Sequence, residues 1–148
     1  MTEPRGIRNN NPGNIRWSKD PWMGLLPVEQ RTDASFCQFT KPEYGVRAMC
    51  KVLLNYRSKP GIPGMGEQGI DTVQEIIHRW APPSENDTGA YVKSVADAAL
   101  VRPDEHCDLT DPVVMSALLR GIIKHENGVQ PYSTQTLNLG MHMAGLAT

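Results

Sequence analysis

The stretch DPVVMSALLRGIIKHENGVQPY, from Asp111 to Tyr132, decides the fold because it carries the signals of a long buried helix. Asp111 is a typical helix N-cap, Pro112 suits the first helical position, and Gly128 follows the last turn. Apolar residues recur between these signals at helical spacing. They form a wide stripe: Val114, Met115, Leu118, Leu119, Ile122 and Ile123. We therefore expect a central helix around which the remaining elements pack.

One carboxylate lies near the end of this helix, on its apolar face. Glu126 follows Ile122, Leu119 and Met115 by four, seven and eleven residues, so at about 100° per residue they share one face. An anion there also faces the negative pole of the helix dipole. A carboxyl group in such surroundings suits general acid catalysis. The alternative is an exposed glutamate in a frayed last turn.

The 148 residues are expected to form one domain with three parts. Residues 1–40 are dense in Asn, Gly and Pro, and SFCQF (Ser35 to Phe39) suits a hairpin strand. Residues 41–132 carry helical patterns, and residues 133–148 form a C-terminal tail that is expected to dock as a short helix. The expected fold class is therefore mainly α (α+β), with a helical body and a small, irregular β-hairpin subdomain.

Local signals place three further helices inside the helical part. The apolar spacing of residues 42–58 predicts a helix that begins at a first-turn proline. Thr72-x-x-Glu75 is a capping box, and it predicts a short helix that ends before two prolines. Another helix is expected over residues 88–100. The Gly- and Pro-rich segment 59–69 reads as a surface loop.

Composition excludes several classes of function. Fifteen Lys and Arg against sixteen Asp and Glu give a net charge of −1, which argues against a non-specific nucleic-acid binder. Arg5, Arg8 and Arg16 are a local basic exception. No stretch of about 18 apolar residues occurs, so membrane insertion is not expected. The polar N-terminus has no apolar h-region, which predicts synthesis in the cytoplasm without a signal peptide.

Metal, thiol and phosphate chemistry have no marked site in the sequence. No HExxH motif occurs, and the four histidines lack ligand spacing. Cys37, Cys50 and Cys107 form no CxxC pair, which is typical of free thiols in a reducing compartment. We therefore predict no metal and no cofactor. A zinc-dependent amidase is the weakest alternative, and metal analysis would reveal it.

The helix ending IIKHENGVQPY, residues 122–132, resembles the catalytic-helix ending of the lysozyme-superfamily peptidoglycan-degrading enzymes, the lytic transglycosylases and muramidases. In those enzymes an apolar helix ends in a catalytic glutamate, followed by a small polar residue and glycine. The resemblance implies that Glu126 is the general acid/base, with Asn127 and Gly128 in the two following positions. ENDTGAYVKSV, residues 85–95, resembles a transglycosylase segment whose tyrosine approaches that glutamate, which implies the same role for Tyr91.

Two N-terminal segments resemble parts of bacterial glucosaminidases of this superfamily. RNNNPGNIRW…WMG, residues 8–24, resembles the Asn-rich segment and Trp-x-Gly that follow their catalytic glutamate. Residues 35–56 resemble their next strand and helix. Because the glutamate helix comes first in those families and last here, the resemblance implies a circularly permuted lysozyme-like fold. RGIRNNNPGNIR, residues 5–16, also resembles small phage and prophage proteins.

The expected substrate-binding residues combine amide and aromatic side chains with one carboxylate. Amides can bond to sugar hydroxyl and acetamido groups, although asparagine is also common in turns. Aromatic rings can stack on sugar faces, although they are more often buried. The carboxylate at position 85 has helix capping as its alternative role. The candidates are Asn11, Asn14, Trp22, Gln38, Glu85 and Tyr132.

The resemblance implies a monomeric phage endolysin or virion-associated lysin whose partner is bacterial peptidoglycan. Such an enzyme cleaves the glycan backbone between N-acetylmuramic acid and N-acetylglucosamine, and reaches the periplasmic wall through a holin-type pore or within the virion. Hydrolysis commonly uses a second carboxylate, for which Asp20, Glu29, Asp33 and Glu85 are candidates, whereas lytic transglycosylases lack one. The alternative is a non-catalytic virion or tail protein that keeps a lysozyme-like fold for assembly.

Overall fold

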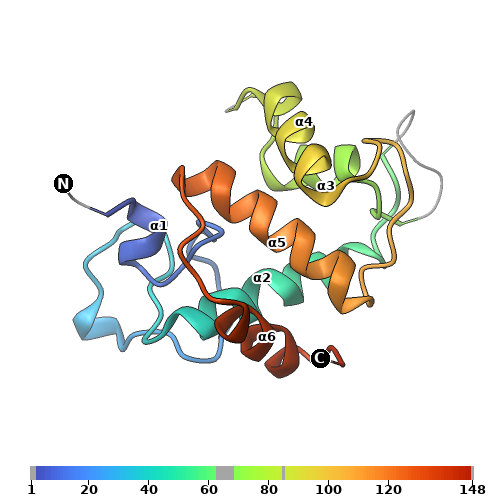
Figure 1. Cartoon of the computed structure of the whole chain (residues 1–148). Helices are drawn as coiled ribbons and strands as arrows, with labels where there is room; N and C mark the ends of the chain where they lie inside the picture. The colour runs from blue at the N-terminus through green and yellow to red at the C-terminus, as the bar shows by residue number, and fades with distance from the viewer. Residues whose placement is uncertain (1–2, 63–68, 85, 148) are drawn as a thin grey trace.

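The computed structural model describes residues 3–62, 69–84 and 86–147, and these residues are mainly helical, as predicted. None of the described helices is long and apolar enough to cross a membrane. The elements along the chain (Figure 1) are α1 (Arg5–Arg8), the 3-10 turn η1 (Val28–Gln30), α2 (Pro42–Tyr56), α3 (Val73–Trp80), α4 (Thr88–Ala99), α5 (Pro112–Asn127) and α6 (Thr134–Met143).

Helix α5 lies at the centre of the molecule, with the bounds that its sequence signals predict. The Asp111 side chain accepts a 2.9 Å hydrogen bond from the Val113 nitrogen and so caps the first turn. Gly128 ends the helix at φ 75°, a left-handed conformation that glycine adopts without a Cβ penalty. Helices α1, α2, α4 and α6 all contact α5. Four of the other five described α-helices therefore pack directly on the helix that carries Glu126.

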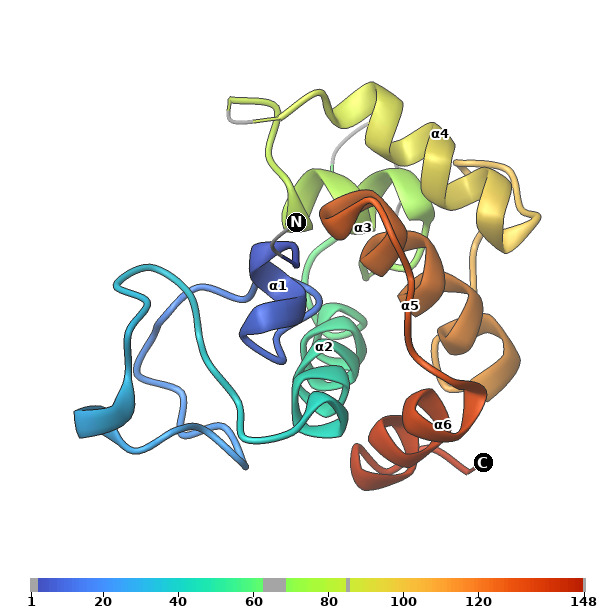
Figure 2. The ribbon, with the colours of Figure 1, turned by 60° about the vertical axis from the view of Figure 1, so that its left-hand side comes forward.

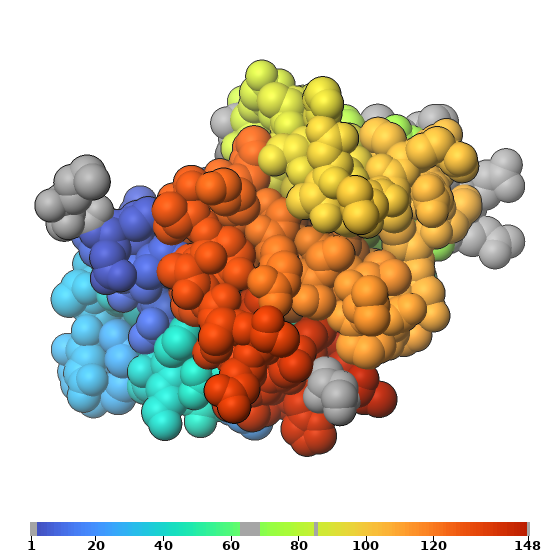
Figure 3. Space-filling model, in the orientation of Figure 1, coloured from blue at the N-terminus to red at the C-terminus, as the bar shows by residue number. Residues whose placement is uncertain are grey.

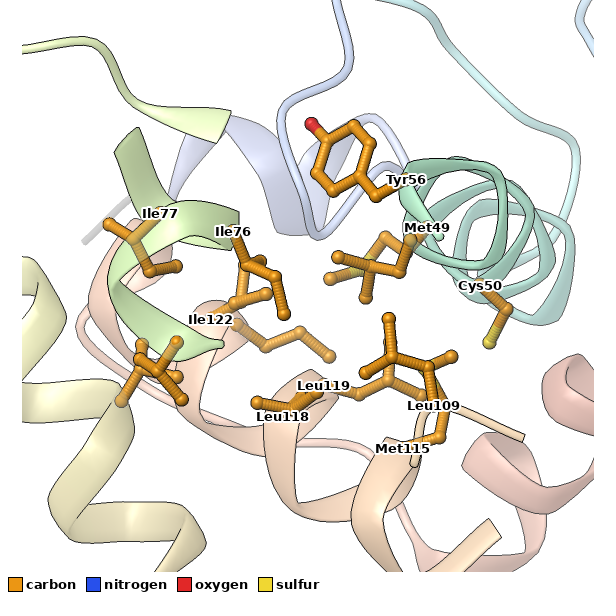
Figure 4. Close-up of a cluster of buried hydrophobic side chains, with 14 of the residues drawn as sticks. Met49, Cys50, Tyr56, Ile76, Ile77, Leu109, Met115, Leu118, Leu119 and Ile122 are labelled. Carbon is orange, nitrogen blue, oxygen red and sulfur yellow. The ribbon is translucent and has the colours of Figure 1, made fainter. Parts of the chain in front are cut away.

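The main core fills the space between α2, α3 and α5. Figure 4 shows apolar side chains of these three helices pointing toward one another, with Leu109 completing the cluster from the loop before α5. Burying one large aliphatic side chain contributes roughly 1.5–3 kcal/mol. The cluster therefore holds α5 firmly against its neighbours. Its fully buried members include Met49, Leu53, Ile76, Ile77, Leu109, Met115, Leu118, Leu119 and Ile122.

The other predicted helices are confirmed, and their caps come from local side chains. In α3 the Thr72 hydroxyl accepts from the Glu75 nitrogen at 3.3 Å and donates to the Glu75 carboxylate at 2.9 Å. Asp87 caps α4, and Ser133 caps α6 in the C-terminal tail. Of the predicted loop 59–69, residues 63–68 lie outside the described residues.

The predicted β-hairpin subdomain is wrong. In Figure 2 the segment between α1 and α2 extends to one side of the helical body. Its described residues pair only through isolated antiparallel bridges, Arg16 with Phe36 and Leu25 with Phe39. Prolines interrupt the segment, and because proline has no N–H donor it cannot sustain a ladder. The corner is thus a folded loop that docks on α2 through a small apolar cluster: Cys37, Phe39 and Ala48.

Buried side chains satisfy backbone groups of this corner in place of a ladder. The Asn11 amide is fully buried, donates to the carbonyls of Ile15 and Cys37, and accepts from the Ile15 nitrogen. Gln38 is also buried, and it is not on a strand as predicted. Both amides, predicted to bind a sugar, instead hold the loop together. The Gln38 amide bonds to Asn9, Thr32 and Asp33.

An ion pair joins α1, a single helical turn that no local sequence signal predicts, to the same corner. Arg5 donates to both carboxylate oxygens of Asp33 at 2.7 Å, and the Asp33 side chain is 8% exposed. This hydrogen bonding holds the pKa of Asp33 well below its usual range. The Trp17 indole adds a bond of 2.8 Å to the Asp33 carbonyl. Arg5 is therefore a paired residue rather than part of a free basic patch.

Candidate active site

Glu126 lies in the last turn of α5, and each of its carboxylate oxygens accepts a hydrogen bond from a distant segment. The Asn14 amide nitrogen donates to Oε1 at 2.9 Å, and the Tyr91 hydroxyl donates to Oε2 at 2.7 Å. Asn14 belongs to the loop after α1, and Tyr91 belongs to α4. The space-filling view shows the α5 segment in orange between the N-terminal segment in blue and α4 in yellow (Figure 3). Three predicted site residues therefore meet at one point.

Tyr91 is a buried hydrogen-bond donor to the Glu126 carboxylate. Its side chain is 1% exposed. Burial first, and the charge of Glu126 second, raise the pKa of Tyr91 well above its usual value. Its ring also stacks on the ring of His125, with the centroids 3.8 Å apart. The hydroxyl therefore keeps its proton, and the carboxylate of Glu126 keeps its partner.

Asn14 reaches Glu126 because a hydrogen bond from Asn127 to Pro12 holds its loop against the end of α5. Its φ of 51° is left-handed, a conformation that asparagine tolerates better than most residues. The Asn127 amide donates to the Pro12 carbonyl at 2.8 Å and to the Ile123 carbonyl at 3.0 Å. Gly6 packs against both asparagines, where an added Cβ would lie 2.5 Å from Asn127 Oδ1 and 2.9 Å from Asn14 Oδ1. The fit leaves no room for a side chain at position 6.

Glu126 opens into a cleft of about 400 Å³. A volume of this order is typical of small-ligand sites. Its walls offer amide, guanidinium and aromatic groups, which can bond to or stack on a sugar. Among the described lining residues Glu126 is the one carboxylate, and Glu85, predicted to bind substrate, lies outside the described residues. The cleft is lined by Gly13, Asn14, Arg16, Phe36, Trp80, Ala81, Asn86 and Glu126.

Two further cavities adjoin the cleft, and each shares lining residues with the next. A middle cavity of about 190 Å³ shares Asn14 and Trp80 with the cleft of Glu126. The same middle cavity shares Tyr56 and Arg79 with a far cavity of about 570 Å³. Trp22 lines the far cavity. We call this succession of three cavities the groove; it places Trp22 at the end opposite Glu126.

Tyr132, predicted to line the cleft, instead packs half-buried against the main core. Its hydroxyl is buried with no hydrogen-bond partner among the described residues. Burial raises the pKa of Tyr132 to about 12. Of the other carboxylates considered, Asp20 lines the far cavity, Asp33 is paired with Arg5, and Glu29 is exposed on η1. None of the three lines the cleft of Glu126.

Several cleft residues were not predicted from the sequence. Trp80 is partly buried against the main core, and it also lines the cleft. Arg16 lies with its guanidinium carbon 5.0 Å from the centre of the Phe36 ring, which places a cation in the cleft wall. Asn86 completes the wall near α4. Asn127 is not among the residues that line the cleft. Its place directly after Glu126 marks it in the sequence, but its hydrogen bond to the Pro12 carbonyl is seen only in the fold.

Thiol and metal chemistry find no site in the described part of the chain. Cys37 and Cys50 are buried, and burial raises the pKa of each thiol, to about 11 and about 12. Such thiols are poor nucleophiles. The described residues hold no cluster of three or more His, Cys, Asp or Glu side chains that could bind a metal ion.

No family model matches the chain. It is 36% identical over 140 residues to a protein named Protein P5 from Pseudoalteromonas phage PM2. The aligned region covers 92% of this chain and 79% of that relative. Because the name of the relative states no activity, the function has to be inferred from the site itself.

Proposed function

This chain belongs to the family of the phage protein P5, and we propose that it cleaves the glycan backbone of bacterial peptidoglycan, between N-acetylmuramic acid and N-acetylglucosamine. Glu126 is the general acid and base of the proposed reaction. The observation that carries the proposal is the geometry of its carboxylate. Both oxygens are held by fixed donors, Asn14 and Tyr91, at the wall of a cleft of about 400 Å³.

The proposed chemistry follows from what glycosidic cleavage requires. The leaving oxygen must receive a proton, and the oxocarbenium-like transition state must be stabilised. Glu126 gives its proton to the leaving oxygen and then, as a carboxylate, takes a proton from the incoming nucleophile. Asn14 and Tyr91 act as positioning residues, because a carboxylate with both oxygens bonded keeps one orientation.

The groove supports a polymeric substrate rather than a single sugar. It extends from Glu126 past Trp80 to Trp22, so aromatic side chains line both its near and far cavities. Aromatic faces and amide groups bind sugar rings by stacking and hydrogen bonding. We infer that the glycan strand lies along this groove with the bond to be broken at Glu126.

A circularly permuted lysozyme-like fold is part of the proposal. Its support is the chain order of the three groups that meet: Asn14 comes first, Tyr91 on α4 next, and Glu126 on α5 last. In the resembled enzymes the glutamate helix comes first. Joining the old termini and opening the chain elsewhere would yield this order with the same neighbours in space.

The phage relative supports a setting in phage infection. We propose a monomeric protein that is made in the host cell and acts on the cell wall. Release through a holin-type pore, or carriage within the virion, would bring it there. Fractionation of purified virions, followed by detection of the protein, separates these two routes.

The test of the function is lysis of purified cell walls by the wild-type protein and by a Glu126→Gln variant. Lysis should be lost in the variant, while its circular dichroism spectrum and Tm stay as in the wild type. Glu29→Gln is the matched control, because Glu29 is exposed and outside the cleft; it should lyse normally. Lysis by Glu126→Gln would contradict the assignment. No lysis by folded wild-type protein would point to the non-catalytic virion role.

The products decide between hydrolysis and transglycosylation. Mass spectrometry of digested muropeptides would show reducing ends after hydrolysis and anhydro ends after transglycosylation. The same measurement on a Glu85→Gln variant tests whether a second carboxylate takes part. Glu85 directly precedes Asn86, a residue of the cleft wall. Unchanged rate and products in that variant would exclude Glu85 from the reaction.

A further inference from the structure

We propose that the far cavity of the groove is an anion-binding subsite for carboxylate groups on the peptide branches of the glycan strand. The identity of the ligand rests on the proposed function. The charge of the cavity does not, because it is a property of the residues that line it. The subsite would give the protein a preference for wall polymer that still carries its acidic peptides.

The far cavity concentrates positive charge in a chain whose net charge is only −1. Four cationic residues line it against the single carboxylate of Asp20. Within the described residues none of the four forms an ion pair. Arg47 donates to the Met143 carbonyl at 3.3 Å, a neutral partner that leaves its charge uncompensated. The four charges are therefore available to an anion entering the cavity. The four are Arg47, Lys51, Lys59 and Arg79.

The fold brings these cations together from two helices. Arg47, Lys51 and Asn55 follow one another at intervals of four residues, so they share one face of α2. Arg79, on α3, lies with its guanidinium carbon 6.0 Å from the centre of the Tyr56 ring. Like charges four residues apart on a helix repel each other. A bound carboxylate would relieve that repulsion, which favours binding of an anion here.

Continuity with the cleft favours the glycan substrate over an unrelated polyanion. The middle cavity shares residues with both the cleft of Glu126 and the far cavity. A strand whose sugar ring lies at Glu126 can therefore extend into the far cavity. There Trp22 and Tyr56 offer aromatic surface beside the cations. Sugar and anion can thus be held by neighbouring groups in one groove.

The experiment measures binding, not cleavage, and uses the full-length Glu126→Gln protein. Co-sedimentation with intact wall sacculi is compared with sacculi whose carboxylates have been converted to amides. We expect amidation to weaken binding about fivefold. Adding Lys51→Gln and Lys59→Gln should weaken binding to intact sacculi by a similar factor and abolish the effect of amidation. Binding to intact sacculi should also weaken as salt is raised.

A matched control removes the same charge elsewhere. Lys93 and Arg102 are exposed and paired with Asp97 and Asp104 on the surface, so Lys93→Gln with Arg102→Gln should bind as the parent protein does. Equal binding to intact and amidated sacculi would overturn the proposal. So would an unchanged affinity in the Lys51 and Lys59 double variant.

Binding measurements with two further polymers identify the source of the anion. Glycan strands stripped of their peptides, with the lactyl carboxylates that stripping frees converted to amides, should bind like amidated sacculi, because no carboxylate remains. If they bind like intact sacculi, binding does not depend on carboxylates and the proposal fails. Tighter binding of duplex DNA than of sacculi would make nucleic acid the ligand. Charge-dependent binding by a wild-type protein that does not lyse walls would overturn the proposed function and leave the subsite standing.

Discussion

The Tyr91 hydroxyl donates a 2.7 Å hydrogen bond to Oε2 of Glu126 and thereby joins α4 to the last turn of α5. These two residues are 35 positions apart in the sequence, so their contact depends on how the two helices pack. The second carboxylate oxygen is held by Asn14, from a third segment. The position of the proposed acid is thus set by three parts of the fold at once.

Replacing Tyr91 with Phe should lower kcat by about ten- to a hundredfold, because a hydrogen bond to a charged group contributes about 1.5–3 kcal/mol. KM should change little, since the hydroxyl contacts Glu126 and not the proposed substrate groove. The ring keeps its buried place, so Tm should fall only by the few degrees that loss of one such hydrogen bond costs. Steady-state kinetics of wall lysis, with thermal unfolding alongside, measure these three quantities.

Tyr44→Phe is the control for that substitution. Tyr44 packs on the small apolar cluster under the N-terminal corner, and it lines none of the three cavities of the groove. Its variant should keep wild-type kcat. If Tyr91→Phe did the same, the bond between Tyr91 and Glu126 would have no part in the reaction.

A methyl group at position 6 should displace the asparagines that position Glu126 and its loop. In Gly6→Ala the new Cβ would lie 2.5 Å from Asn127 Oδ1 and 2.9 Å from Asn14 Oδ1, so one or both asparagines must move. Crowding of this kind costs about 1–3 kcal/mol, and movement of Asn14 should lower kcat as well. Gly89→Ala is the control, because its Cβ would have nothing closer than 3.8 Å. Urea denaturation and lysis rates should separate the two variants, and equal values would refute the packing argument.

The helices from α2 to α6 could be predicted because their signals are local. Asp111, Pro112 and Gly128 mark the ends of α5 within a few residues of the chain, and the apolar stripe between them needs no distant partner to be recognised. Glu126 was found from the same stripe. The resemblance to wall-degrading enzymes added Tyr91, whose contact with Glu126 the fold confirms.

The N-terminal corner could not be predicted in the same way, because a strand depends on its partner. The alternation of SFCQF suits a strand, yet the facing segment offers only isolated bridges. Likewise Asn11 and Asn14 are chemically identical and three residues apart, but one is fully buried and the other reaches Glu126. The fold of the loop decides which amide faces the cleft, together with the hydrogen bond from Asn127 that holds the loop to α5.

The stability of the protein should fall at alkaline pH. Burial raises the pKa of Tyr56 and Tyr132 to about 12, whereas a tyrosine in an unfolded chain titrates near 10. Between pH 10 and 12 the unfolded chain therefore loses protons that the folded protein keeps, and the free energy of unfolding falls as pH rises. Below pH 10 this contribution is fully present.

Urea denaturation at pH 9, 10, 11 and 12 measures this effect. Each raised tyrosine should contribute a slope of up to about 1.4 kcal/mol per pH unit in that window. Tyr56→Phe should make the decline less steep, because Phe cannot titrate. A free energy of unfolding that stays constant from pH 9 to 12 would show that these hydroxyls are not buried as described.

Asn14→Asp tests whether the Asn14 amide acts on Glu126 as a donor. Aspartate matches asparagine in shape and tolerates the φ of 51° at this position. It would, however, place a second carboxyl group about where the amide now bonds Glu126 at 2.9 Å. At low pH the new carboxylic acid can donate a proton to Glu126 as the amide does. At high pH both groups are ionised and repel each other.

The activity of the Asn14→Asp variant relative to wild type should therefore rise as pH falls, and a kcat/KM profile from pH 4 to 8 would show it. Asn14→Ala, which has no titrating group, should be impaired by a constant factor across that range. A constant ratio for Asn14→Asp as well would mean that Asn14 shapes the loop without directing a hydrogen bond at the proposed acid.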